Sequence, residues 1–386
     1  DTYNVAVGYN AGYAVTTGLQ NVLVGGLAGD ALTTGGGNVA VGYQALSAED
    51  GNGTNVAIGF QSLLAQNAGA NAYSVAVGYL AGSAISTGVH NTLIGGLAGD
   101  ALTTGGQSVA IGYGALGTED TASRSTAIGY NALEAQNSSS SNTYNVAVGF
   151  DAGLSVTTGV YNTIIGGKAG DALTSGSYNV AIGYAALGAE DTHGGNIAIG
   201  HEALVTQDAG ADAYNVAIGY EAGHDISTGI KNVCIGRRAG DALTTGENNI
   251  IIGNSAAASA VDVDNEITLG NTNISAIRAQ VTSISSLSDK RDKKDIKDSI
   301  YGLDFVDSLK PVTFEWDQRD GNRSGVKDVG FIAQDLQEVD DEYTRLVYES
   351  NPDKLEATYG RLIPIMAKAI QELSAEVKEL KKQING

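Results

Sequence analysis

The sequence is poor in the residues that cross-link or interrupt a chain. Cys234 is the one cysteine among 386 residues, which excludes the framework of intrachain disulfides that staples small secreted proteins. The three prolines, Pro311, Pro352 and Pro364, all follow residue 288. Because proline cannot donate a ladder hydrogen bond, the earlier part of the chain is free to form a long array of central strands.

Positive charge and long apolar runs are also scarce. No lysine precedes Lys168, and residues 1–287 contain 6 Lys and Arg against 22 Asp and Glu. The net charge of −21 repels phosphate backbones, so we expect no nucleic-acid binding. No apolar run approaches the roughly 20 residues that span a bilayer, so we expect no membrane insertion. The sequence has no signal-like start and begins at Asp1, so we expect a fragment or a processed product.

The first part of the chain contains a repeat. The phrase Asn-Val-Ala-Val-Gly or a variant of it begins at Asn4, Asn21, Asn38, Asn55, Ser74, Asn91, Ser108, Ser125, Asn145, Asn162, Asn179, Asn196, Asn215, Asn232 and Asn249. Most steps are 17 residues and every fourth step is longer. A higher unit of about 70 residues therefore recurs, as in repeat architectures.

Each phrase has the period of a strand. Val5 and Val7 alternate with Ala6, which gives one β-branched face and one face of small residues. A coil of this length has room for about two short strands, and stacked coils can bury a Val/Ile row that one coil cannot. The sequence therefore predicts a mainly β fold, with a parallel β-solenoid or β-roll over residues 1–253.

Acidic residues recur in the repeats without the arrangement of a metal site. One aspartate per unit lies in Ala-Gly-Asp-Ala-Leu-Thr, at Asp30, Asp100, Asp171 and Asp241. These could line a column of cation sites, but calcium needs six or more oxygens, and aspartate is far commoner in turns and caps. The four histidines occupy unrelated positions in the repeat. We therefore expect neither a metal nor another cofactor.

Other repeated features favour structure over catalysis. Tyrosines follow the strand glycine in many coils, which favours a stacked ladder over a sugar-binding face. No pair of carboxylates has the fixed register of a glycosidase, so we expect no enzyme activity in the repeats. Long loops break the period at 66–72, 136–143 and 207–213, and their Gly, Ser and Asn content suits adaptable binding loops and inert spacers equally.

The period ends after residue 253, and residues 254–287 are expected to form a strand-rich neck. Residues 288–386 are a charged α/β sequence. We expect a helix over 289–308, strands at 312–316 and 346–348, and a turn at 320–322. The last helix has apolar residues at heptad positions a and d, namely Ile363, Met366, Ile370, Leu373, Val377, Leu380 and Ile384. Roughly three heptads predict a coiled coil; the alternative is a helix packed on its own domain.

Ser288 and Lys293 form a candidate catalytic pair. Ser–Lys pairs occur among nucleophilic catalysts, where a desolvated lysine takes the proton of the serine. The spacing of five residues is not specific, because this segment contains several lysines.

The same segment carries a resemblance to a known family. The motifs are Ser288-Asp289-x-Arg291-x-Lys293, Leu309-Lys310-Pro311-Val312-x-Phe314-x-Trp316 and Gly330-Phe331-Ile332-Ala333-Gln334-Asp335. Over roughly residues 287–384 the chain resembles the self-cleaving C-terminal chaperone domain of phage tailspikes, tail fibres and endosialidases. The resemblance implies that Ser288 is the nucleophile, Lys293 the base and Leu287–Ser288 the bond that is cut. It also implies supporting roles for the motif residues Asp289, Arg291, Gly330, Phe331 and Gln334.

Residues 4–253 resemble the heads of trimeric autotransporter adhesins, which have shorter coils. The two resemblances imply an intertwined homotrimeric tail fibre or tailspike of a bacteriophage, made in the host cytoplasm and present in the virion. They also imply a host-surface receptor, for which a glycan is one class, and other virion tail proteins as partners through a preceding N-terminal part. A bacterial trimeric surface adhesin, which would need a membrane anchor, and a polysaccharide-degrading tailspike are the alternatives.

Overall fold

The chain contains two compact units, Asp1–Asn271 and Thr272–Gly386. The structure, a computed structural model, describes residues 2–139, 142–274, 276–278, 288–317, 324–349, 351, 353 and 355–385. Within these residues, none of the helices combines the length and the apolar character that a bilayer span requires.

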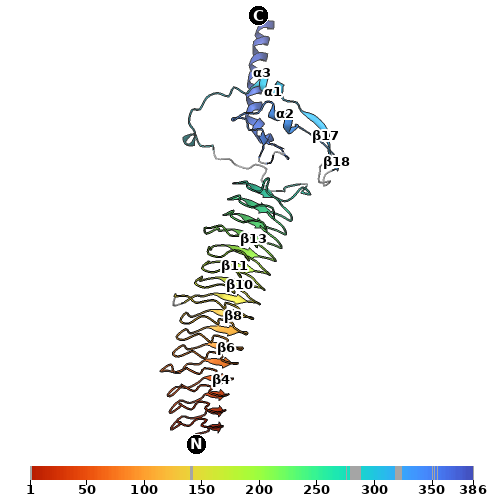
Figure 1. The fold of residues 1–386 in the computed structure, drawn as a ribbon. Coiled ribbons are helices and arrows are strands. Elements are labelled where there is room, and N and C mark those ends of the chain that lie inside the picture. The colour runs from red at the N-terminus through yellow and green to blue at the C-terminus, as the bar shows by residue number, and fades with distance from the viewer. Residues whose placement is uncertain are drawn as a thin grey trace. The chain divides into compact units, whose positions relative to one another are not determined.

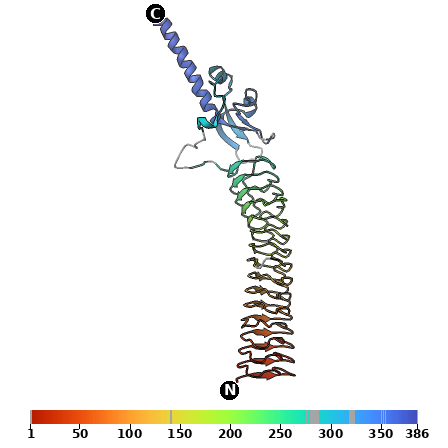
Figure 2. The ribbon, with the colours of Figure 1, turned by 90° about the vertical axis from the view of Figure 1, so that its left-hand side faces the viewer.

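The first unit is a stack of coils joined by one parallel sheet. Its sixteen strands have three residues each and lie in sequence order, so each strand pairs with the strands before and after it (Figures 1 and 2). They are β1 Val5–Val7, β2 Val22–Val24, β3 Val39–Val41, β4 Val56–Ile58, β5 Val75–Val77, β6 Thr92–Ile94, β7 Val109–Ile111, β8 Thr126–Ile128, β9 Val146–Val148, β10 Thr163–Ile165, β11 Val180–Ile182, β12 Ile197–Ile199, β13 Val216–Ile218, β14 Val233–Ile235, β15 Ile250–Ile252 and β16 Ile267–Leu269. The predicted mainly β fold, with a parallel β-solenoid, is confirmed.

Each coil contains one strand, whereas the sequence suggested two. After the strand, φ is positive at every second residue, with 134° at Gly8, 53° at Asn10 and 61° at Gly12. An extended strand needs negative φ throughout, so this side of the coil forms turns. These turns still bond to the next coil, for example from Gly12 N to Ala28 O at 3.0 Å.

The two faces of each strand point the opposite way from the prediction, which placed the Val and Ile residues in the interior. From β2 to β15 the middle residue, an Ala, Leu, Ile or Cys, is buried in a continuous core. It packs against apolar side chains from the turn side of the coil, such as Leu32 and Leu46, which fill the interior. The Val and Ile residues therefore point outward, and Ile94 and Ile165 remain 39% and 38% exposed.

The single cysteine and the tyrosines also belong to columns of the solenoid. Cys234 occupies the middle position of β14, where burial raises the pKa of its thiol to about 12. Aromatic rings stack between neighbouring coils at centroid distances of 5.1 to 5.6 Å, in the series Tyr43–Phe60–Tyr79, Tyr113–Tyr130–Phe150 and Tyr184–His201–Tyr220. The predicted stacking of the tyrosines is confirmed.

A ladder of polar side chains, asparagine in most coils, connects the coils just before the strands. Asn21 donates through Nδ2 to Gly35 O at 2.9 Å, and its Oδ1 accepts from Asn38 N at 2.9 Å. The ladder continues one coil beyond residue 253, the predicted end of the repeats. There Glu266 N donates to Asn249 Oδ1 at 2.8 Å, and β16 pairs with β15 in register.

The second unit is a small α/β domain. Its elements are the 3-10 turn η1 Lys290–Asp292, α1 Leu303–Ser308, β17 Val312–Asp317, β18 Ser324–Gly330, α2 Ala333–Gln337, β19 Val347–Tyr348, β20 Glu356–Ala357, η2 Tyr359–Arg361 and α3 Leu362–Asn385. β17 pairs with β18 and β19 with β20, both antiparallel. The core residues are Leu336, Leu346, Val347, Leu362 and Ile365. The expected strands at 312–316 and 346–348 are present, and the turn expected at 320–322 lies outside the described residues.

The helix expected over 289–308 is wrong. Only η1 and α1 are helical there, and Asp295 has a φ of 53°, which a continuous helix does not accept. Ile296 and Ile300, the residues that suggested an apolar helix face, are exposed.

The terminal helix has two separate apolar faces. Leu362, Ile365 and Ala369 are buried against the domain core or close to it. The heptad residues on the other face are exposed, and Ile363 and Ile370 are 65% and 66% accessible. The start of α3 therefore packs on its own domain while its heptad face stays uncovered in the single chain.

Candidate functional site

The candidate pair Ser288 and Lys293 is brought together by one turn of chain. Asp289 caps this turn, η1, by accepting from Arg291 N at 2.8 Å. Lys293 then donates its backbone N–H to Lys290 O at 3.2 Å, which reverses the chain toward Ser288. Lys293 Nζ lies 2.5 Å from Ser288 Oγ and 3.4 Å from Ser288 O. The side chains of Ser288 and Lys293 are thus in hydrogen-bond contact.

A local ion pair holds the turn in place. Arg291 donates through Nε and Nη2 to the carboxylate of Asp289 at 3.0 and 2.6 Å. The hydrogen bonds from Arg291 lower the pKa of Asp289 below its usual value, so its carboxylate remains an acceptor. In the sequence motif, Asp289 and Arg291 therefore position the chain between Ser288 and Lys293.

Both members of the pair are exposed in the single chain. A lysine becomes a base where burial disfavours its charged form. The geometry of the pair is present, whereas a water-excluding cover is not found in the described part of this chain. Leu287, the residue before the predicted cut, lies outside the described residues.

The second motif lies at the end of β18 and in α2. A Cβ atom at Gly330 would approach the Tyr359 hydroxyl to 2.6 Å, so only glycine fits there without a shift. The same hydroxyl accepts from Phe331 N at 3.2 Å, and the two rings meet edge-on at 5.8 Å. Gln334 is exposed on α2.

This second motif supports the domain rather than the pair. Among the described residues, no hydrogen bond or ion pair connects Gly330, Phe331 or Gln334 with Ser288 or Lys293. Its contacts join the end of β18 to η2, next to the start of α3.

The comparison with known families gives a match in this part of the chain. Residues 288–347 match the peptidase family described as chaperone of endosialidase. The match begins at Ser288 and ends in β19, so it includes the Ser288–Lys293 pair and the Gly330–Phe331 motif. The comparison with curated proteins gives no match. A segment similar to the chaperone-of-endosialidase family thus follows a β-solenoid in this chain.

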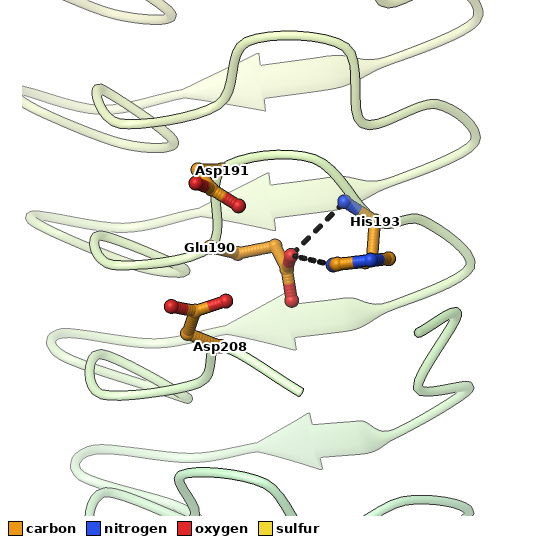
Figure 3. Close-up of side chains that lie close together, drawn as sticks. All are labelled: Glu190, Asp191, His193 and Asp208. Atoms are coloured by element: carbon orange, nitrogen blue, oxygen red, sulfur yellow. Dashed lines mark hydrogen bonds and ion pairs between the residues drawn. The ribbon is translucent and has the colours of Figure 1, made fainter. Parts of the chain in front are cut away.

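A second group of polar side chains lies in the repeats and was missed from the sequence. Glu190, Asp191, His193 and Asp208 meet between two successive coils (Figure 3). The histidines look unrelated when aligned by the repeat, and only the stacking of coils brings Asp208 beside His193. A comparison of the three long loops gives the available signal, because the third has aspartate where the others have Asn67 and Asn137.

The aspartates that recur once per unit do not form such a group. Asp30 accepts a hydrogen bond from the Ser47 hydroxyl of the next coil at 2.5 Å. Asp100 and Asp171 have raised pKa values because they are partly buried. Since these residues recur only in every fourth coil, they lie too far apart to share cations in a column.

Proposed function

We propose that the chain is a homotrimeric fibre or spike protein whose C-terminal domain directs assembly and then cuts itself off between Leu287 and Ser288. The observation that carries this proposal is the contact between Lys293 Nζ and Ser288 Oγ at 2.5 Å. It occurs at the first residue of the segment that matches the chaperone family. A serine at a domain boundary with a lysine in contact is suited to cleavage on its own N-terminal side.

The proposed reaction is hydrolysis of one peptide bond through an ester. Neutral Lys293 accepts the hydroxyl proton of Ser288 while Oγ attacks the carbonyl carbon of Leu287. The carbon–nitrogen bond breaks, and the nitrogen takes the proton to become the free amine of Ser288. Water then hydrolyses the ester, which leaves a carboxylate on Leu287 and restores the Ser288 hydroxyl.

In this proposal the reaction waits for assembly, because Ser288 and Lys293 are exposed in the single chain. Lys293 acts as a base only where water is excluded from it, and in the single chain both side chains are exposed. Neighbouring chains of a trimer would supply the missing cover. Cleavage would then follow assembly and make it effectively irreversible.

Two uncovered apolar surfaces support a trimer. The outward Val and Ile residues form a continuous row along the sheet, and the heptad face of α3 is exposed. Burying such surfaces in an oligomer is favourable at about 25 cal/mol per Å² of apolar area. In isolated peptides, β-branched residues at a with leucine at d favour dimers. The proposal of three chains rather than two therefore rests on the family resemblance.

A need for such a chaperone follows from the fold. Parallel strands fold slowly and expose unpaired edges while they do so. A domain that trimerises first places three repeat segments at high effective concentration. We propose accordingly that the protein belongs to a bacteriophage virion, as a tail fibre or tailspike that contacts a host-surface receptor.

The test of this function is expression of the full chain beside single-residue variants. We expect wild type to give two fragments, one that starts at Ser288 by N-terminal sequencing, and Ser288→Ala and Lys293→Ala to give one full-length band. Lys290→Ala and Lys294→Ala are matched controls, because they remove neighbouring lysines and should leave cleavage intact. Cleavage at the same bond in Ser288→Ala would disprove the assignment.

A further inference from the structure

Four potential metal ligands from two successive coils converge in the third repeat unit (Figure 3). One ligand atom from each of Glu190, Asp191, His193 and Asp208 lies within 4.8 Å of the other three. Glu190 Oε1 accepts from His193 N at 3.0 Å and lies 3.2 Å from His193 Nδ1. Asp208 comes from the following coil, at the start of its long loop.

The buried carboxylate in this group is incompletely satisfied. Glu190 is fully buried, and its Oε2 atom has no hydrogen-bond partner among the described residues. An unpaired carboxylate oxygen in a protein interior is costly unless a proton or a cation compensates it. Asp191, His193 and Asp208 retain access to solvent, so an ion can reach the group.

The second repeat unit shows how the protein satisfies the same carboxylate without an ion. Glu119 is the equivalent of Glu190, and its Oε1 accepts from Ala122 N at 2.9 Å in the same way. Its Oε2, however, accepts from Gln136 Nε2 at 3.0 Å. Gln207, the equivalent glutamine in the third unit, instead donates to Ser227 O at 3.1 Å.

The third unit also differs in the two positions that face the carboxylate. His193 replaces Asn52 of the first unit and Ala122 of the second. Asp208 replaces Asn67 and Asn137 at the start of the long loop. The third unit therefore combines an imidazole and a third carboxylate around a glutamate that all three units contain.

We propose that Glu190, Asp191, His193 and Asp208 bind one divalent transition-metal ion, with Zn²⁺ as the representative. Imidazole with carboxylates suits zinc and its neighbours, whereas calcium and magnesium prefer oxygen ligands alone. Zinc bonds to nitrogen and oxygen are about 2.0–2.2 Å long, so the four ligand atoms of a tetrahedral ion lie about 3.4 Å apart. The ligand atoms of this group lie within 4.8 Å of one another, so shortening their separations by up to roughly 1.4 Å would give that geometry.

The ion would tie one coil to the next. Three ligands come from the coil that contains β11, and Asp208 from the coil that contains β12. Because an ion that binds only the folded chain raises its stability, zinc should increase the temperature of unfolding.

The first test titrates the purified full chain with ZnCl₂ and, separately, with CaCl₂ by calorimetry. We expect one Zn²⁺ per chain and no calcium step in the same concentration range. His193→Ala and Asp208→Asn restore residues found in the other units, so they should fold and should weaken zinc binding by roughly tenfold or more. His224→Ala, which removes a histidine outside the group, should leave binding unchanged. Equal zinc affinity in wild type and both ligand variants would overturn the proposal.

The second test transfers the site to the first unit. Glu49 has the same bond to Asn52 N, at 3.1 Å, and its Oε2 also has no partner among the described residues. Asn52→His combined with Asn67→Asp should raise the stoichiometry from one to two Zn²⁺ per chain. A count that stays at one in this double variant would contradict the assigned set of ligands.

Discussion

At the scale of single residues, a buried asparagine determines how one coil sits on the next. Asn162 accepts through Oδ1 from Asn179 N at 2.9 Å and donates through Nδ2 to Gly176 O at 2.8 Å. Both bonds are made inside the protein, where an unpaired backbone group is costly. The asparagine thus satisfies two backbone groups of the next coil.

We predict that Asn162→Ala destabilises the solenoid. It leaves the Asn179 N–H and the Gly176 carbonyl without their partner, at a cost of about 1–3 kcal/mol each. Asn162→Ser should cost less, because Ser74 occupies an equivalent place and accepts from Asn91 N at 3.4 Å. Urea unfolding followed by circular dichroism measures the free energy of unfolding of both variants. An equal loss of free energy in the Ala and Ser variants would contradict the role of the acceptor oxygen.

The contact between the proposed catalytic residues could be predicted from the sequence, whereas the metal-ligand group in the repeats could not. Ser288 and Lys293 are five residues apart, so a local turn suffices to join them. His193 and Asp208 are separated by a whole coil, and their proximity depends on how far each turn advances. Burial of Glu190 likewise depends on the stack, which composition does not reveal.

At the scale of elements, the strands were more predictable than the segments between them. A Val-Ala-Val alternation determines a strand by its period of two. The turn side of the coil uses positive φ at non-glycine residues such as Asn10, for which the sequence has no strong signal. The direction of the two strand faces was mispredicted because it depends on the turn-side residues that share the core with the strand.

One loop of the C-terminal domain is organised by a single carboxylate. Asp340 accepts through Oδ1 from Asp341 N, Thr344 Oγ1 and Leu346 N at 3.0, 2.6 and 2.7 Å. Its Oδ2 accepts from Val347 N at 3.0 Å, at the start of β19. Burial alone would raise the pKa of Asp340, but these hydrogen bonds outweigh it and lower the pKa below 3.8.

We predict that this domain loses stability in acid through Asp340. A lowered folded pKa means that the contribution is present above the ordinary value of 3.8 and is lost as the pH falls through the folded value. Asp340→Asn should remove this dependence and cost about 1–3 kcal/mol at pH 7, because an amide accepts through one oxygen only. Fluorescence of Trp316, the single tryptophan, follows unfolding of this domain. The exposed Asp307→Asn is the control, and the same acid profile in both variants would refute the assignment.

The heptad face of α3 gives a second prediction at this scale. Ile370→Asp with Leu373→Asp should lower the oligomeric state without unfolding the domain, because both side chains are exposed in the single chain. Ile365→Asp should instead unfold the domain, because Ile365 belongs to its core. Light scattering after size-exclusion chromatography measures the first effect. An unchanged oligomer in the double variant would show that α3 does not associate through this face.

At the scale of the whole molecule, the proposed order of events is assembly followed by cleavage. We predict that a gene lacking residues 288–386 yields aggregated or monomeric repeats, because the outward Val and Ile row then lacks partners during folding. Removal of the same residues after folding should leave an intact trimer. Sedimentation of both preparations distinguishes them. A soluble trimer of normal melting temperature from the truncated gene would exclude a chaperone role.

The regular pairing of successive coils allows the length of the solenoid to change by recombination. Each coil contacts only its neighbours, and strands of successive coils meet in the same register throughout. Neighbouring strands are about 4.8 Å apart, so recombination that duplicates one four-coil unit would lengthen the rod by roughly 19 Å. The new junction would repeat bonds that the protein already makes. The length of the repeat region can therefore evolve by copying units, while the C-terminal domain stays the same.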